Sequence, residues 1–123
     1  MASVLLIDDD DMIQATLKAA LELAGYDVAI AGNGRDGLRQ FSAHRPDIVI
    51  TDIIMPEQEG IETILAIRKL DPTIPIIAMS GGSSLGSVDF LAAALSFGAT
   101  RILNKPFGPK ALVNAIRECM AAT

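Results

Sequence analysis

Short aliphatic runs alternate along the chain with segments in which apolar residues recur every three or four positions. The runs are apolar throughout, which is typical of strands that are buried on both faces. Five strands are therefore expected, at residues 4–7, 28–31, 48–51, 76–79 and 102–103.

The spaced apolar residues that follow each run predict helices. These helices are expected to include residues 13–24, 38–41, 61–67, 91–95 and 112–120. Gly25 and Gly98 stand where helices commonly end, and Asp71-Pro72 stops the third helix.

Five strand–helix pairs predict an α/β fold, with one domain over residues 1–123. Strands without a polar face favour a parallel sheet that carries helices on both sides. Right-handed crossovers then leave few topologies, of which a doubly wound sheet is the expected one.

Polar residues follow the strands at the ends where such sheets bind ligands. Asp8 and Asp9 follow the first strand, Asp52 the third, Ser80 the fourth and Lys105 the fifth. Because the carboxyl ends of parallel strands meet at one edge of the sheet, we expect these side chains to share a crevice.

The three aspartates in this set point to a divalent cation. If the first and third strands are neighbours, about 4.8 Å apart, Asp8, Asp9 and Asp52 repel each other unless a cation compensates them. Mg²⁺ (or Mn²⁺) prefers such oxygen ligands. With the amine of Lys105 and the hydroxyl of Ser80, the set suits phosphoryl transfer, in which one carboxylate acts as nucleophile and forms an acyl phosphate.

Each of these residues alone also has a simpler interpretation. Asp10 and Asp11, which continue the acidic run, are expected to begin the first helix as its N-cap and first-turn acid. Asp52 could cap a loop, Lys105 could be a solvated surface lysine, and Ser80 could merely begin a turn. Their joint position at one sheet edge favours the functional interpretation.

Composition narrows the class of partner. The 123 residues are 50% hydrophobic with 4% aromatic residues and no Trp, so the core is aliphatic and base-stacking platforms are not expected. A net charge of −5 argues against direct binding of nucleic acid or anionic membranes. The single cysteine, Cys119, and the absence of a signal peptide or a membrane-spanning run favour a cytoplasmic location.

Several segments together resemble a response-regulator receiver domain of two-component signalling, in its chemotaxis-regulator-like form. The matching segments are residues 4–9, 47–56 with Gly60, 76–81, 98–99 and 103–107. They contain an acidic pair, an Asp-x-x-Met-Pro motif and a Lys-Pro-Phe motif, which are jointly specific in this order and spacing.

The resemblance implies a flavodoxin-like (βα)5 fold with a five-stranded parallel sheet in the order 2-1-3-4-5. It implies that Asp52 is the phosphoacceptor, and that Asp9, Asp52 and the backbone carbonyl of Ile54 bind Mg²⁺ directly. Asp8 would bind the metal through water.

The resemblance also assigns two further residues of the site and identifies two departures. Ser80 would be the switch hydroxyl, and Lys105 would pair with Asp52 or its phosphate. The family often has an aromatic switch residue where this chain has Ile102, which we expect to be a packing residue. The loop at residues 81–87 is longer than usual and rich in Gly and Ser, so an order–disorder change there is a hypothesis for switching.

The expected function is a phospho-accepting switch with intrinsic autophosphorylation and autodephosphorylation chemistry, not an enzyme in its own right. A sensor histidine kinase or phosphotransfer protein would be the donor. Output would pass, through the surface of the fourth helix, fifth strand and fifth helix, to a downstream protein or to an output domain missing from this chain. That surface includes Arg101, Lys110 and Arg117, and dimerisation through it is left open.

Three alternatives remain at this stage. Asp8-x-Asp10 resembles the opening motif of haloacid-dehalogenase-like phosphatases, although their downstream acidic pair is missing. Gly32-x-Gly34-x-x-Gly37 formally matches a nucleotide-binding glycine pattern, but it follows the second strand instead of the first. A degenerate receiver that acts only as a scaffold is the third alternative.

Overall fold

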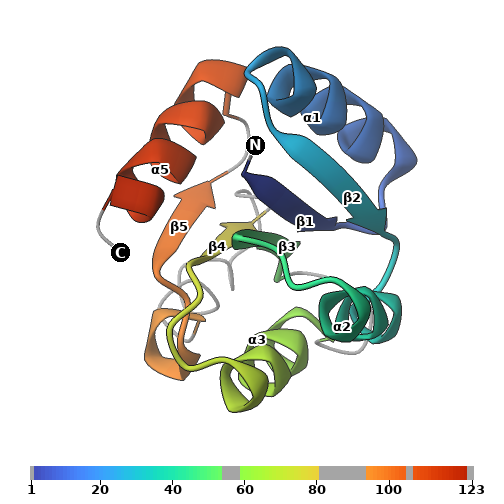
Figure 1. Ribbon diagram of the computed structural model, residues 1–123, viewed down its shortest axis with the longest axis vertical. Helices are drawn as coiled ribbons and strands as arrows, with labels where there is room; N and C mark the ends of the chain where they lie inside the picture. The colour runs from blue at the N-terminus through green and yellow to red at the C-terminus, as the bar shows by residue number, and fades with distance from the viewer. Residues whose placement is uncertain (1, 54–58, 81–93, 105–106, 122–123) are drawn as a thin grey trace.

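Strands and helices alternate along the chain, as the sequence predicts (Figure 1). The computed structural model describes residues 2–53, 59–80, 94–104 and 107–121. The elements are β1 (Ser3–Ile7), α1 (Asp11–Leu23), β2 (Asp27–Ala31), α2 (Gly34–Ala43), β3 (Ile48–Asp52), α3 (Glu59–Leu70), β4 (Ile76–Ser80), β5 (Arg101–Asn104) and α5 (Pro109–Ala121).

The five strands form one parallel sheet in the order β2-β1-β3-β4-β5. This confirms the flavodoxin-like, doubly wound (βα)5 fold. Most strands extend one residue beyond the apolar run that predicts them, because main-chain pairing does not depend on side-chain polarity. β2 begins at the exposed Asp27, for example, which pairs with Ser3.

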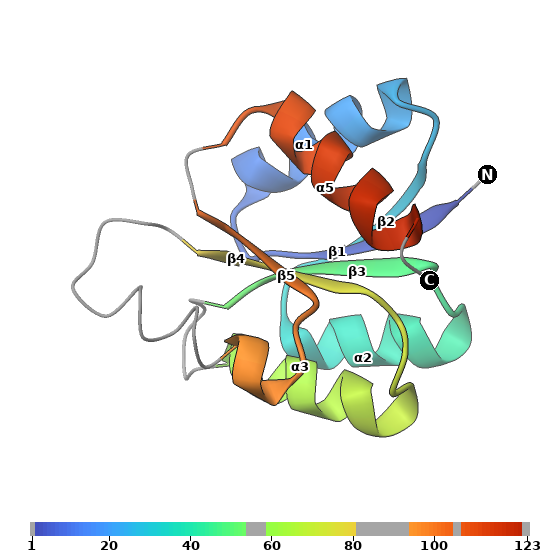
Figure 2. The same cartoon turned by 90° about the vertical axis from the view of Figure 1, so that its left-hand side faces the viewer.

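Two separate cores lie on the two faces of the sheet, because successive strand side chains point in opposite directions. Figure 2 shows α2 and α3 covering one face and α1 and α5 covering the other. The first core includes Leu5, Ile7, Val49, Phe41, Ile64 and Ile67. The second core includes Val4, Leu6, Ile50, Leu17, Leu21, Leu112 and Ile116.

Helix ends follow the sequence signals. Asp10 is the N-cap of α1, where its side chain accepts hydrogen bonds from the N–H groups of Met12 and Ile13, and Asp11 lies in the first turn. Gly25 has φ +97°, so it adopts the left-handed conformation that ends the helix without steric cost. Of the expected fourth helix, at residues 91–95, residues 91–93 lie outside the described part of the chain, and residues 94–97 are helical.

The methionines differ in burial. Met12, Met55, Met79 and Met120 are not clustered along the sequence, which predicts packing residues, and Met79 and Met120 do pack in the second core. For Met12 this prediction is wrong. Met12 is 79% exposed, because it lies on the solvent side of the first turn of α1. Met55 lies outside the described residues. No helix in the described ranges is long and apolar enough to cross a membrane.

Candidate functional site

Asp8 begins the turn between β1 and α1 and is held on three sides. Its N–H donates to the carbonyl of Ala31 at 3.1 Å, which continues the pairing of β1 with β2. Its carboxylate accepts a hydrogen bond from the N–H of Asp10 at 2.9 Å, and its carbonyl accepts one from Nε2 of Gln14 at 2.5 Å. Asp8 is fully buried, whereas Asp9, the next residue, is exposed.

Asp52 is the last residue of β3 and is 6% exposed. β3 lies between β1 and β4, and the N–H of Ile53 still donates to the carbonyl of Met79 at 3.0 Å. Gly60, in the first turn of α3, packs directly against this strand end. A Cβ atom at Gly60 would lie 2.5 Å from the Asp52 carbonyl oxygen and 2.3 Å from Cα of Ile53.

The carboxylates of Asp8, Asp9 and Asp52 converge, as the sequence predicts. Each offers one oxygen, and the three oxygens lie within 4.8 Å of one another. The pairing of Ile7 with Thr51 explains this, because the next residues of the two strands, Asp8 and Asp52, are then neighbours.

The donor set fits a hard divalent cation. Three carboxylate oxygens match the preference of Mg²⁺ and Mn²⁺ for oxygen ligands, and a 2+ charge relieves the repulsion of three acids at short range. The mixture of buried and exposed carboxylates gives the cluster a side open to solvent, as a metal that keeps several waters requires.

Two more predicted site residues lie on neighbouring strands. Ser80 ends β4, and its backbone is paired in register with Asn104 of β5, so it lies at the same sheet edge as Asp52. Ile102 lies on β5, is partly buried and packs against the first core.

Other predictions for the site fall outside the described part of the chain. These are the roles of Lys105 and of the Ile54 carbonyl, and the hypothesis about the loop at residues 81–87.

The structure describes β5 and α5 of the expected output surface, and residues 94–97 of its fourth helix. Arg101 of β5 forms an ion pair with Glu118 of α5, and this pair bridges the two elements. Lys110 and Arg117 are exposed on α5.

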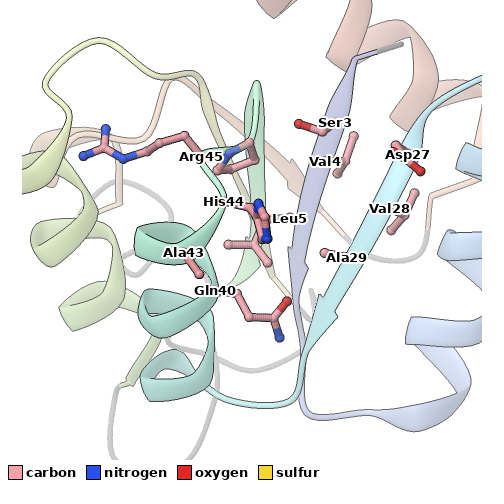
Figure 3. Close-up of a pocket in the computed structure, with 11 residues that line it drawn as sticks. Ser3, Val4, Leu5, Asp27, Val28, Ala29, Gln40, Ala43, His44 and Arg45 are labelled. Atoms are coloured by element: carbon pink, nitrogen blue, oxygen red, sulfur yellow. The ribbon is translucent and has the colours of Figure 1, made fainter.

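A hollow of about 510 Å³ lies at the opposite end of the strands (Figure 3). It is bordered by the amino ends of β1 and β2 and by the carboxyl end of α2, where His44 is the exposed C-cap. Among the described residues, the acidic cluster is not at this hollow but at the carboxyl ends of the strands. The acidic cluster is therefore separate from this hollow.

Comparison with known proteins distinguishes among the interpretations of this site. Residues 4–117 match the family model described as the response regulator receiver domain. The chain belongs to the response-regulator receiver family. This agrees with the resemblance carried by the acidic pair, the Asp-x-x-Met-Pro motif and the Lys-Pro-Phe motif.

Individual relatives of this receiver domain differ in how much of their length it covers. It is 38% identical over 117 residues to the transcriptional regulatory protein PrrA of Mycobacterium tuberculosis. This alignment covers 95% of the present chain but only 49% of PrrA. It is also 38% identical to the chemotaxis protein CheY of Thermotoga maritima, over 94% of both chains. A crystal structure of a receiver-domain protein from Clostridium thermocellum superposes with a TM-score of 0.90 at 32% identity, covering 99% of this chain and 96% of the other.

Membership of this family argues against two of the three alternative functions considered from the sequence. The match runs through all the strands, which argues against a haloacid-dehalogenase-like phosphatase and against a flavin or nucleotide site. Gly34 and Gly37 instead serve α2: Gly34 is its first residue, and a Cβ at Gly37 would lie 2.5 Å from Cδ1 of Ile7.

Two residues that contact the site have no structural role predicted from the sequence, although Gly60 belongs to the matching segments. The close approach of Gly60 to the Asp52 backbone depends on how α3 crosses the strand end, although the glycine after the Met-Pro motif was a signal. Gln14 carried no signal of its own, since glutamine on an amphipathic helix is ordinarily a surface residue.

Proposed function

We propose that this receiver domain is a phospho-accepting switch in which Asp52 receives a phosphoryl group from a phosphohistidine. The donor is a sensor histidine kinase or a phosphotransfer protein. The convergence of Asp52 with Asp8 and Asp9 at the carboxyl edge of the sheet, in a chain of this family, is the observation that supports the proposal.

The proposed reaction moves one phosphoryl group between two side chains. A carboxylate oxygen of Asp52 forms a bond to phosphorus while the phosphorus–nitrogen bond of the phosphohistidine breaks. The electron pair of that bond returns to the imidazole, which takes up a proton from solvent. The product on this chain is an acyl phosphate, and later attack by water returns the aspartate and inorganic phosphate.

We propose Mg²⁺, or Mn²⁺ in its place, as the cofactor. Asp9, Asp52 and the backbone carbonyl of Ile54 would bind it directly, and Asp8 would bind it through water. When bound, the metal neutralises charge that develops on the phosphoryl oxygens. Asp8 also has a structural role that does not need the metal, because its carboxylate accepts a hydrogen bond from the Asp10 N–H at the start of α1.

The remaining roles in the proposal follow the residues that the family motifs contain. Lys105 supplies a positive charge to the phosphoryl group, and Ser80 is the hydroxyl that responds to it. Ile102, without a polar group, contributes packing to that response. The change then reaches the loop after β4 and the surface of the fourth helix, β5 and α5, where a downstream protein or an output domain binds.

Partners and setting are proposed from the same properties. We take residues 1–123 as one receiver domain, with its own chemistry limited to autophosphorylation and autodephosphorylation. A net charge of −5 disfavours direct contact with nucleic acid or membrane. A cytoplasmic location agrees with the free, buried Cys119. Formation of a homodimer through the surface of β5 and α5 is left open, and a measurement of the molecular mass in solution would test it.

The decisive experiment is phosphorylation by acetyl phosphate followed by mass spectrometry of the intact protein. With Mg²⁺, the unsubstituted chain is expected to gain one phosphoryl group, and Asp52→Asn is expected to gain none. Asp27→Asn is the matched control, because Asp27 is exposed at the opposite end of the sheet and its variant should be modified normally. Chelation of the metal should suppress the gain.

Two results would contradict the proposal. Equal modification of Asp52→Asn and the unsubstituted chain would place the acceptor elsewhere. A folded chain that gains no phosphoryl group from acetyl phosphate or a phosphohistidine donor would support the scaffold alternative.

A further inference from the structure

The turn between β1 and α1, residues 8–10, contains three of the acids and is called the acidic turn. Among the described residues of α1, Gln14 alone has a side chain that hydrogen-bonds to the backbone of this turn. Its Nε2 donates to the carbonyl oxygen of Asp8 at 2.5 Å. This carbonyl belongs to the peptide that joins Asp8 to Asp9. The bond therefore restrains the plane of that peptide and, with it, the direction in which the Asp9 side chain leaves the backbone.

Gln14 acts from a rigid support. α1 is anchored by Leu17, which is buried in the second core, and by Ile13, which packs against that core. Gln14 lies next to Ile13 on the first turns of the helix and is partly buried. The amide is thus presented to Asp8 from an element that packing already fixes.

The two acids at this turn are restrained to different degrees. Asp8 is fully buried, and its carboxylate accepts a hydrogen bond from the Asp10 N–H. Asp9 is exposed, and within the described part of the chain no hydrogen bond or ion pair holds its side chain. The place of the Asp9 carboxylate relative to Asp52 therefore depends on the backbone, and Gln14 is a side chain from α1 that restrains that backbone.

We propose that Gln14 is a positioning residue that sets the Mg²⁺ affinity of the site by holding the Asp8–Asp9 peptide. This proposal depends on the proposed function, because it assumes that the cluster binds the metal. Partners that orient metal ligands without touching the metal commonly change affinity by about 10- to 100-fold when they are removed. The amide is neutral, so its removal changes position and leaves the charge of the site unaltered.

The test is Mg²⁺ binding by isothermal titration calorimetry to Gln14→Met, which keeps the length of the side chain and removes the donor. Gln40→Met is the matched control. Gln40, seen in Figure 3, also donates through Nε2 from a helix to a strand carbonyl, that of Ile30 at 2.8 Å. It donates to the Asp36 carboxylate as well, at 3.0 Å, and it does not contact Asp8, Asp9 or Asp52. We expect the dissociation constant to rise roughly tenfold in Gln14→Met and to stay within about twofold in Gln40→Met.

A second measurement needs no metal. Amide hydrogen exchange of the metal-free protein should be faster at Asp10 in Gln14→Met than in the unsubstituted chain, since the Asp10 N–H is bonded to the Asp8 carboxylate. Gln40→Met should leave that amide unchanged. Circular dichroism of both variants shows whether each is folded.

The outcomes separate this proposal from the proposed function. Mg²⁺ binding by the unsubstituted chain, with the same dissociation constant in Gln14→Met, would overturn the role of Gln14 alone. Equal weakening in both glutamine variants would also overturn it, because a general loss of rigidity would then explain the effect. No Mg²⁺ binding by the unsubstituted chain would overturn both proposals.

Discussion

Gly60 offers the sharpest test of how the fold holds the candidate acceptor. In Gly60→Ala, the new Cβ would lie 2.3 Å from Cα of Ile53 and 2.5 Å from the Asp52 carbonyl oxygen, whereas ordinary contacts begin at 3.4 Å. Both atoms belong to the backbone of a strand end, so no side-chain rotation can relieve the overlap. α3 and β3 must separate by about 1 Å to admit the methyl group.

The expected cost follows from two opposing effects. Forcing an extra methyl group into a packed site costs about 1–3 kcal/mol, and contacts with backbone atoms favour the upper end. The better helix propensity of Ala offsets at most about 1 kcal/mol. The net loss in free energy of unfolding is therefore about 2 kcal/mol, or roughly 6–10 °C in Tm for a domain of this size.

Two other glycines give a graded comparison in urea unfolding followed by circular dichroism. In Gly37→Ala the Cβ meets the Ile7 side chain, with Cδ1 at 2.5 Å and Cγ1 at 2.9 Å. Because these are side-chain and not backbone atoms, a smaller loss than that of Gly60→Ala is expected. In Gly32→Ala the nearest atom is Nε2 of Gln14 at 3.8 Å, an ordinary contact, and stability should change by less than about 0.5 kcal/mol. If Gly60→Ala is as stable as Gly32→Ala, the reasoning is wrong.

The same substitution tests the link between packing and chemistry. Moving the end of β3 by about 1 Å displaces Asp52 relative to Asp8 and Asp9, and displacements of this size can slow a reaction by up to about a hundredfold. Phosphorylation by acetyl phosphate should therefore be slower in Gly60→Ala and normal in Gly37→Ala. Equal rates would show that the position of Asp52 does not depend on Gly60.

Three further predictions concern residues away from the site. Arg68 of α3 donates to the carbonyl of Gly98 at 2.8 Å and so ties α3 to the turn before β5; Arg68→Met should lower the free energy of unfolding by about 2 kcal/mol, measured in urea. Hydrogen bonds from the backbone and hydroxyl of Thr73 lower the pKa of Asp71. A carboxyl group with a lowered pKa stabilises the fold at pH values above its ordinary pKa, near 4, and this stabilisation is lost as the pH falls below that value. The difference in stability between the wild type and Asp71→Asn should therefore shrink from pH 6 to pH 3. Burial raises the pKa of the Cys119 thiol, so iodoacetamide at pH 8 should label the native protein far more slowly than the unfolded one.

Each of these predictions has a contradicting result. Unchanged stability in Arg68→Met would mean that water replaces the lost bonds at no cost. If the difference in free energy of unfolding between the wild type and Asp71→Asn does not depend on pH, the Asp71 carboxyl group has the same pKa in the folded and the unfolded chain. Rapid native labelling of Cys119 would show that α5 opens readily from the second core.

The fold was readable from sequence because its signal is repetitive and local. Strand runs such as 4–7 and 48–50 are apolar at every position, and that pattern is typical of strands buried on both faces of a parallel sheet. Caps such as Asp10 and Gly25 act within one turn of the helix that they end, so their effect depends on nearby residues alone. The strand order came from the family resemblance, since periodicity carries no information on which strands are neighbours.

The acidic site was predictable for the same reason: Asp8, Asp9 and Asp52 follow strands whose carboxyl ends must share an edge. The exposure of Met12 was not, because a hydrophobic residue in the first turn of an amphipathic helix can face either way.

The sequence by itself determined most residues of the strands and helices, the parallel arrangement of the sheet, and the convergence of Asp8, Asp9 and Asp52 at its carboxyl edge. Only the tertiary structure decided that Gly60 touches the Asp52 backbone and that Gln14 reaches the Asp8 carbonyl. These contacts depend on the position and angle at which helices cross the sheet, and those are set by the packing of all the side chains at once.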